Sequence, residues 1–242
     1  MIRIAAVGDV HLGEDAHGRL RPALERLPQH ADVLLLAGDL TRHGTEEEAR
    51  VVAAEFRDLG VPVLAVLGNH DYHCDEVSAL TQILTDAGIQ VLEGDGVVLP
   101  VGGLRLGVAG VKGFGGGFAG KCGSNFGEPE MKAFVGHTIE IADKLRSALD
   151  SLSCDTRVAL MHYAPVPQTL HGEPPEIYPF LGAYQLGEAV DATGTDLALH
   201  GHAHMGSERG VTPGGVRVRN VAQPVIRSAF TVYGLEAGTG ED

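Results

Sequence analysis

Positive charge is scarce in this 242-residue sequence, which has 18 lysine and arginine residues against 32 aspartate and glutamate residues. The formal net charge is −14, and the basic residues are scattered along the chain rather than clustered. A nucleic-acid partner requires a dense track of basic side chains, and an anionic membrane surface attracts the same kind of patch. The composition therefore argues against nucleic-acid and membrane partners.

Cysteine residues and long apolar runs are also few. The three cysteines form no C-x-x-C pair and are odd in number, which argues against a disulfide framework and fits a reducing compartment. The N-terminal MIRIAAVGDVHLG lacks the apolar core and the cleavage site of a signal peptide. No apolar run approaches the ~20 residues that span a bilayer. These absences predict a cytoplasmic protein.

Short β-rich runs alternate with helical patterns along the chain, which is typical of an α/β layered fold. The length suits one domain, or at most two small ones, and because no linker or repeat divides the chain we expect a single domain over residues 1–242. Helices are predicted at about 17–29, 45–59, 75–87 and 130–152. Strands are predicted at 2–7, 33–37, 61–67, 97–101, 104–109, 157–161, 196–199, 216–221 and 229–235. The terminal GTGED, 238–242, is expected to fray.

Two long loops interrupt this alternation. Residues 112–129 are glycine-rich, residues 164–185 are proline-rich, and each segment follows a predicted strand. Loops of this length in a domain are usually functional or mobile. FGGGF at 114–118 fits either a glycine hinge with aromatic lids or a plain crossover. The second loop, through Tyr178 and Phe180, fits either a pocket wall or an oligomer contact.

Five of the predicted strands are followed by side chains that can bind metal ions. These are two carboxylates, one amide and four imidazoles: Asp9, His11, Asp39, Asn69, His162, His202 and His204. In open α/β sheets, ligands bind at the carboxyl ends of the strands, and residues i and i+2 of an extended chain point the same way. We therefore expect all seven side chains to meet at one edge.

The chemistry of these donors favours transition metals. Nitrogen and oxygen donors without a thiolate suit Mn, Fe, Zn, Co or Ni better than Ca or Mg. Seven donors are too many for one tetrahedral ion but suit two ions that share Asp39. Two divalent cations, two carboxylates and one hydroxide leave a net charge of about +1, which suits an anionic phosphate. Each motif alone also fits a turn or a packed histidine, but together they predict a metal centre.

In chain order the motifs read D-x-H, G-D, G-N-H-D, H and G-H-x-H, from Asp9 to His204. This ordered set resembles the calcineurin-like metallophosphoesterase family. The resemblance implies a four-layer αββα sandwich with two mixed β-sheets and an active site at the carboxyl ends of the strands. It also implies two metal sites. One is formed by Asp9, His11, Asp39 and His204, and the other by Asp39, Asn69, His162 and His202.

The same resemblance assigns catalytic roles to His70 and Asp71. His70 lies outside the metal ligands and is expected to stabilise the phosphoryl transition state or to protonate the leaving oxygen, while a metal-bridging hydroxide attacks phosphorus. Asp71 is expected to fix the tautomer of His70. Expectations for four neighbouring positions follow: His200 packs behind the site, His43 and His73 line the pocket or face solvent, and Cys74 is a small buried residue.

The subfamily signs favour a phosphodiesterase. After Asp39 the sequence LTRHGTEEE resembles the class III cyclic-nucleotide phosphodiesterases, whereas the D-R-G and G-N-H-E motifs of the Ser/Thr phosphatases are absent. Histidine rather than arginine at position 70 argues against the lipid A pathway hydrolases. We expect a small phosphate-ester substrate, with a phosphomonoesterase as the alternative and a nuclease third because of the acidic surface. A non-catalytic scaffold of this fold is disfavoured, because every ligand position is filled. The oligomeric state stays open.

Overall fold

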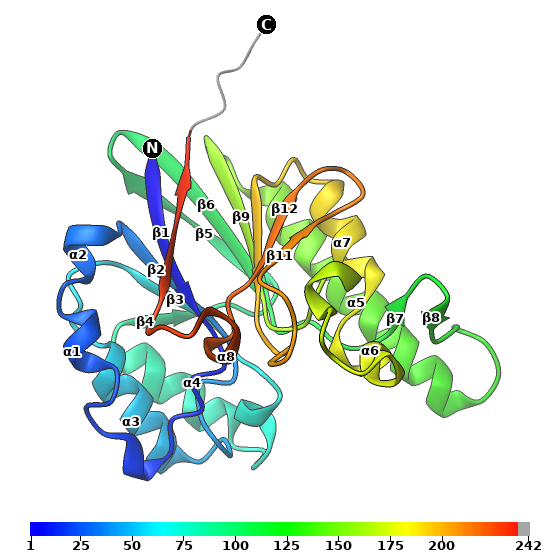
Figure 1. The fold of residues 1–242 in the computed structure, drawn as a ribbon, viewed down its shortest axis with the longest axis horizontal. Coiled ribbons are helices and arrows are strands. Elements are labelled where there is room, and N and C mark those ends of the chain that lie inside the picture. Colours follow the sequence, from blue (N-terminus) through cyan, green and yellow to red (C-terminus); the bar gives the residue numbers. More distant parts are fainter. Residues whose placement is uncertain (237–242) are drawn as a thin grey trace, which may run out of the picture.

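Two mixed β-sheets lie face to face at the centre of the protein (Figure 1). The computed structural model describes residues 1–236, and the predicted fraying of 238–242 lies outside them. The first sheet has the order β13-β1-β2-β3-β4, in which β13 alone is antiparallel to its neighbour. Its strands are β1 (Ile2–Val7), β2 (Val33–Ala37), β3 (Val63–Val66), β4 (Ile89–Val91) and β13 (Thr231–Leu235).

The second sheet has the order β11-β12-β10-β9-β6-β5, with antiparallel pairs at its two edges and parallel pairs between. Its strands are β5 (Asp95–Val101), β6 (Leu104–Val111), β9 (Thr156–Met161), β10 (Leu197–His200), β11 (Arg209–Val211) and β12 (Arg217–Asn220). All nine predicted strands are present: β1 and β2 have the predicted bounds, and the others differ by one or two residues at one or both ends. Sequence reasoning missed the short β4 and β11, which have only three residues each.

Side chains alternate between two apolar layers along each strand, because successive residues of a strand point to opposite faces. In β2, Leu35 packs into the layer between the sheets, together with Val108 and Leu160 of the second sheet. Leu34 and Leu36 point the other way, into the cluster that includes the apolar faces of α3 (Glu46–Phe56) and α4 (Val77–Asp86). The central parallel strands, such as β2 and β3, are thus buried on both faces, as parallel sheets require.

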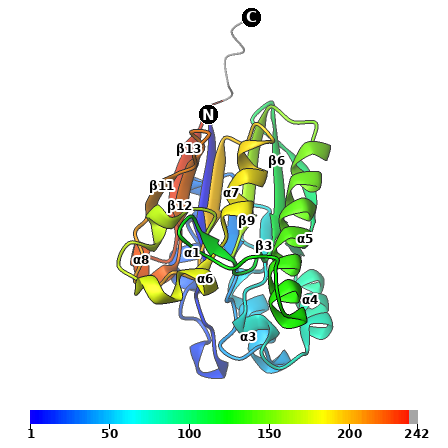
Figure 2. The same ribbon diagram turned by 90° about the vertical axis from the view of Figure 1, so that its right-hand side faces the viewer.

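Helices cover the outer face of each sheet. On the second sheet, α5 (Pro129–Ser151) and α7 (Tyr184–Asp191) pack against β6, β9 and β10. Figure 1 shows α5 and α7 on the side opposite α1 and α2, and Figure 2 brings them to the front. The order helix, sheet, sheet, helix is the predicted αββα sandwich, and this fold prediction is confirmed.

One helix prediction is wrong. The expected helix at 17–29 is instead a 3-10 turn, η1 (Glu14–Ala16), followed by α1 (Arg21–Leu24) and α2 (Leu27–His30). Pro22 and Pro28 each stand in the first turn of one of these helices. Because proline lacks an N–H and its ring clashes with the preceding turn, Pro28 ends one helix and starts another. The other three predicted helices are present as α3, α4 and α5.

The two predicted loops are ordered and pack on each other. The first contains the hairpin of β7 (Gly117–Phe118) and β8 (Lys121–Cys122), and the second contains η3 (Pro167–Leu170), η4 (Pro175–Ile177), α6 (Tyr178–Leu181) and the start of α7. Figure 1 shows β7, β8 and α6 together beyond the sheets. The N–H of Gly116 donates to Pro179 O at 2.7 Å, and that of Gly117 donates to Gly182 O at 2.8 Å. A side chain at Gly116 would crowd Ala183 of the second loop and Thr138 of α5, whereas one at Gly117 would overlap Lys121 across the hairpin. Gly116 therefore serves packing between the loops, and Gly117 serves the hairpin itself.

Candidate metal centre

The turns after five strands bring the predicted ligands to one place. Parallel strands end at the same edge, so the turns after β1, β2 and β3 meet those after β9 and β10. Metal-competent side chains form two groups, and within each group the ligand atoms lie within 4.8 Å of one another. The first group is Asp9, His11, Asp39 and His204, and the second is Asp39, His162 and His202. Asp39 belongs to both groups, as the sequence predicted.

Short distances connect the members of these groups. In the first group, Nε2 of His204 lies 2.9 Å from Oδ1 of Asp9 and 3.4 Å from Nε2 of His11. In the second, Nε2 of His162 lies 3.4 Å from Oδ1 of Asp39. Asn69, the seventh predicted ligand, places its Oδ1 3.0 Å from the same His162 nitrogen. The amide oxygen therefore lies beside the second group, where the sequence expected it.

Backbone carbonyls fix the orientation of two of the ligand imidazoles. Nδ1–H of His162 donates to Ala37 O at 2.8 Å, and Nε2–H of His202 donates to Phe180 O at 3.1 Å. The second nitrogen of each ring then carries a lone pair in the neutral form, as a metal ligand must. Sequence reasoning missed both carbonyls, because a carbonyl has no residue-type signature. The Phe180 contact also shows that the 164–185 segment forms part of the wall of the centre.

The ligand turns adopt strained backbone conformations. Asp9, His11, Asp39 and His202 have φ values of 56°, 42°, 49° and 69°, in the left-handed region that non-glycine residues avoid. Each such residue costs on the order of 1–2 kcal/mol, and strain of this kind concentrates at functional sites. Glycine at position 201 permits the close approach, because a Cβ there would overlap the Asp9 carboxylate. Unfavourable backbone conformations in these turns therefore bring the ligand side chains together.

Charge is concentrated around Asp39. Burial disfavours ionisation of this carboxyl, but His162 and His70 beside it hold its pKa well below the ordinary value. Burial alone would lower the pKa of His162, yet the Asp39 and Asp9 carboxylates raise it to about 9. Burial and the nearby His162 lower the pKa of His202 to about 3. Asp39 is thus ionised and His202 neutral, which are the metal-binding forms, and a metal ion would displace the proton of His162.

These observations fit two transition-metal ions. The donor set has two carboxylates and four imidazoles in two groups joined by a shared Asp39, with an amide oxygen beside the second group. Mixed nitrogen and oxygen donors of this kind are the ligands of Mn, Fe, Zn, Co and Ni. The second nitrogens of His162 and His202 are held by carbonyls, which is the usual support for metal-bound histidine.

His70 lies beside the centre without joining either ligand group. Its Nε2 is 4.0 Å from Oδ2 of Asp39, and its ring centroid is 4.5 Å from that of His11. Its Nδ1–H donates to Arg42 O at 2.8 Å, which leaves Nε2 directed at the centre. The side chain is 44% exposed, so a bound substrate can reach it.

Asp71 does not have the contact that the sequence predicted. Its carboxylate is completely buried and accepts from the N–H groups of Leu40, Thr41 and Gly68 and from the Thr41 hydroxyl. The carbonyl of Arg42, rather than Asp71, orients the ring of His70. The tautomer-fixing role predicted for Asp71 is therefore wrong. Asp71 instead ties the turn after β2 to the turn after β3.

The remaining expectations near the centre have mixed outcomes. His200 is fully buried and bonds to Gly201 O and to Thr169 Oγ1, so its predicted packing role is confirmed. His43 pairs with Glu48 at 3.0 Å and belongs to neither ligand group. Cys74 is exposed, so its predicted burial is wrong.

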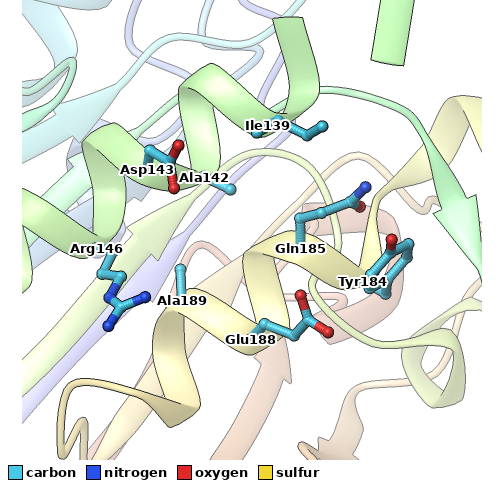
Figure 3. A pocket seen from close by; sticks show the side chains of 8 residues that line it. All are labelled: Ile139, Ala142, Asp143, Arg146, Tyr184, Gln185, Glu188 and Ala189. Atoms are coloured by element: carbon cyan, nitrogen blue, oxygen red, sulfur yellow. The ribbon is translucent and has the colours of Figure 1, made fainter. Parts of the chain in front are cut away.

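A separate groove lies between α5 and α7, away from the ligands. It has a volume of about 290 Å³, and Figure 3 shows side chains of both helices lining it. Its lining residues are Ile139, Ala142, Asp143, Arg146, Tyr184, Gln185, Glu188 and Ala189. None of the predicted ligands is among them, so the groove forms no part of the metal centre.

Comparison with known proteins agrees with this geometry. A sequence model of the calcineurin-like phosphoesterase family matches residues 2–206, and the chain belongs to this family of metal-dependent phosphoester hydrolases. The structure is similar to that of phosphopantetheinyl hydrolase from Mycobacterium tuberculosis, with a TM-score of 0.69 and 17% identity over 99% of this chain and 98% of that chain. No curated protein sequence matches the chain.

Two other solved structures share the fold. A putative 5′-nucleotidase from Staphylococcus aureus has a TM-score of 0.59 and 18% identity, over 90% of this chain and 48% of that chain. GAP50, described as the anchor in the inner membrane complex of Plasmodium, has a TM-score of 0.55 and 12% identity, over 92% of this chain and 72% of that chain. In residues 1–236 of the present protein, no helix has the length and apolarity needed to span a bilayer.

Proposed function

We propose that this protein is a phosphodiesterase that hydrolyses small phosphate diesters with two transition-metal ions, drawn from Mn, Fe, Zn, Co and Ni. The observation that carries the proposal is the pair of ligand groups that share Asp39. When bound, two ions at such a site supply Lewis-acid stabilisation of the phosphoryl oxygens and activate water. The protein's own residues then hold the phosphate in place and manage the proton of the leaving group.

His70 is the residue that serves the leaving group. Its Nε2 faces the centre, its Nδ1–H is held by Arg42 O, and its partial exposure leaves room for substrate. A protonated imidazole in this place has a proton on Nε2 and can donate it to the departing alkoxide oxygen. A neutral imidazole could donate a hydrogen bond to a phosphoryl oxygen only if its single proton were on Nε2 instead of Nδ1. The Arg42 contact keeps a proton on Nδ1. His70 therefore acts as a general acid in its protonated form.

The charge of the centre supports a diester over a monoester. With two divalent ions, the two carboxylates and a hydroxide would leave about one net positive charge on the ions and their ligands. The proton of His70 is left out of this balance, because it departs with the leaving group. Asp71, a further carboxylate in the turn after β3, is buried and bound by backbone N–H groups. A phosphodiester carries one negative charge, whereas a monoester carries close to two at neutral pH. The diester therefore matches the charge of the centre better.

Reloading the metal-stripped protein tests this proposal. The protein is loaded in turn with Mn, Zn, Fe, Ni or Mg, and its hydrolysis of bis-p-nitrophenyl phosphate is compared with that of p-nitrophenyl phosphate. The expected result is metal-dependent turnover with a higher kcat/KM for the diester. A higher kcat/KM for the monoester with every metal would favour the phosphatase alternative. Two bound ions with no turnover of either ester would favour a non-catalytic scaffold.

A further inference from the structure

A buried lysine lies beside the metal centre, where neither the predicted ligands nor His70 make use of it. Lys112 directly follows β6 and is only 8% exposed. Its Nζ lies 5.0 Å from the ring centroid of Tyr72, 5.1 Å from that of Phe114 and 5.4 Å from that of Tyr163. These are cation–π distances, so three aromatic rings surround the ammonium.

Two of these rings belong to segments of the metal centre. Tyr72 ends the 3-10 turn η2 (His70–Tyr72), and the ring of Tyr163 lies 4.3 Å from the ring of His202. The Lys112 carbonyl accepts the N–H of His162 at 2.9 Å and that of Tyr163 at 3.1 Å. The segment that holds the ammonium therefore also supports the turn that carries His162. The position of Lys112 is coupled to the centre.

The ammonium of Lys112 lacks the partner that a buried cation needs. Within residues 1–236, its one hydrogen bond goes to Gly113 O at 3.3 Å, and it forms no ion pair with a carboxylate. Glu93 accepts the backbone N–H of Lys112 at 2.9 Å, and the charges of Glu93 and Asp39 act on the ammonium from a distance without an ion pair. A buried charge without an ion pair is costly, and the aromatic faces offset only part of that cost. In the part of the chain that the structure describes, the other N–H groups of the ammonium thus face aromatic rings and have no oxygen acceptor.

We propose that Lys112 is a specificity residue that binds a second anionic group of the substrate, beyond the phosphate at the metal centre. This inference rests on the proposed phosphodiesterase function. The favoured substrates are diesters in which one arm carries a phosphate or a carboxylate. The metal centre already balances the charge of the scissile phosphate, so that phosphate does not need Lys112. The three aromatic rings around the ammonium carry no negative charge. An anionic arm reaching across Tyr163 supplies that partner.

A matched pair of substrates tests the proposal. p-Nitrophenyl phenyl phosphate and p-nitrophenyl 4-carboxyphenyl phosphate have the same leaving group and differ by one carboxylate. With the metal-loaded protein, KM for the carboxylated ester is expected to be about tenfold lower, as one charge-assisted hydrogen bond would give. Lys112→Met is expected to remove this KM ratio by raising KM for the carboxylated ester, and Lys112→Arg to keep most of it.

Lys121→Met is the matched control, because Lys121 also lies over a tyrosine ring, that of Tyr178 at 5.0 Å, but outside the centre. It should retain the wild-type KM ratio. The proposal is overturned if Lys112→Met keeps the wild-type ratio, or if it raises KM equally for both esters, since the lysine would then serve the scissile phosphate. Melting curves of the variants identify any loss of folding.

A binding experiment separates this proposal from the proposed function. If the wild-type protein hydrolyses neither ester, calorimetry compares phenylphosphonate with 4-phosphonobenzoate, which differ by one carboxylate and cannot be hydrolysed. Tighter binding of 4-phosphonobenzoate that is lost in Lys112→Met supports the anion site even though the enzyme proposal has failed. Equal binding of the two phosphonates overturns the anion site.

Discussion

At the scale of single residues, the chemistry depends on which nitrogen of each imidazole is free. Carbonyls of Ala37, Phe180 and Arg42 occupy one nitrogen of His162, His202 and His70 respectively. The free nitrogens of His162 and His202 then serve metal binding, whereas that of His70 lies 4.0 Å from Asp39 and serves the substrate. The same residue type thus has two functions, which its backbone partner and its distance from Asp39 determine.

Replacing His70 by alanine separates these functions. We expect kcat to fall by roughly 10²- to 10⁴-fold, the usual contribution of a general acid. The metal content should stay at the wild-type value, because His70 belongs to neither ligand group. Elemental analysis and diester kinetics on the same sample check both statements. His73→Ala is the control, because His73 is an exposed neighbouring histidine. Loss of metal in His70→Ala would show that His70 is itself a metal ligand.

Metal binding should release protons in a pH-dependent way. The pKa of His162 is raised to about 9 in the free protein, so its ring is protonated at pH 7 and must lose that proton to bind a metal ion. A hydrogen bond to Asp9 also raises the pKa of His204. We expect release of about one proton or more per protein at pH 7, falling as the pH rises through 9. Calorimetry in buffers of different ionisation enthalpy measures this number, and release that stays constant across that range would contradict the account.

At the scale of elements, the ligand turns depend on close approach between segments from different strands. Glycine at 201 stands directly against the Asp9 carboxylate, although the two residues follow different sheets. Asp71 ties the turn after β2 to the turn after β3 through the N–H groups of Thr41 and Gly68. Each turn is therefore held in place by its neighbour rather than by its own sequence.

Gly201→Ala should weaken metal binding without unfolding the protein. The added methyl group would push the Asp9 carboxylate out of position. Disturbing the groups that hold a metal ligand in place lowers metal affinity by on the order of 10- to 100-fold. Gly136→Ala in α5 is the control, because a Cβ there meets no atom within 4 Å. Metal titration of both variants checks the prediction. Equal affinities would show that the turn tolerates the side chain.

The strands could be predicted from the sequence because each is a short apolar run followed by a turn. The ligands could be predicted for a related reason: Asp, Asn and His stand at the ends of these runs. The packing of the 112–129 loop on the 164–185 loop could not be predicted. The contact of Gly116 with Pro179 joins segments 63 residues apart, so it leaves no local sequence pattern. The role of Asp71 was missed because its partners are backbone N–H groups. Lys112 was missed because an isolated lysine after a strand carries no signal of its aromatic surroundings.

At the scale of the whole molecule, the centre exists only where the two sheets meet. The first sheet contributes Asp9, His11, Asp39 and Asn69, and the second contributes His162, His202 and His204. Asp39 is the member that joins the groups, because it lies within reach of His11 and of His162. The apolar layer between the sheets, which includes Leu35 of the first sheet and Leu160 of the second, holds the two halves together. Metal binding and the sandwich fold are therefore linked.

The metal content and diester turnover of Asp39→Ala test the dinuclear centre most directly, measured on one preparation with Asp86→Ala on α4 as control. In the control we expect two ions and full turnover. In Asp39→Ala we expect loss of the paired ions and a loss of turnover to near background, because the shared ligand is gone. Two ions and wild-type turnover in Asp39→Ala would contradict the dinuclear centre.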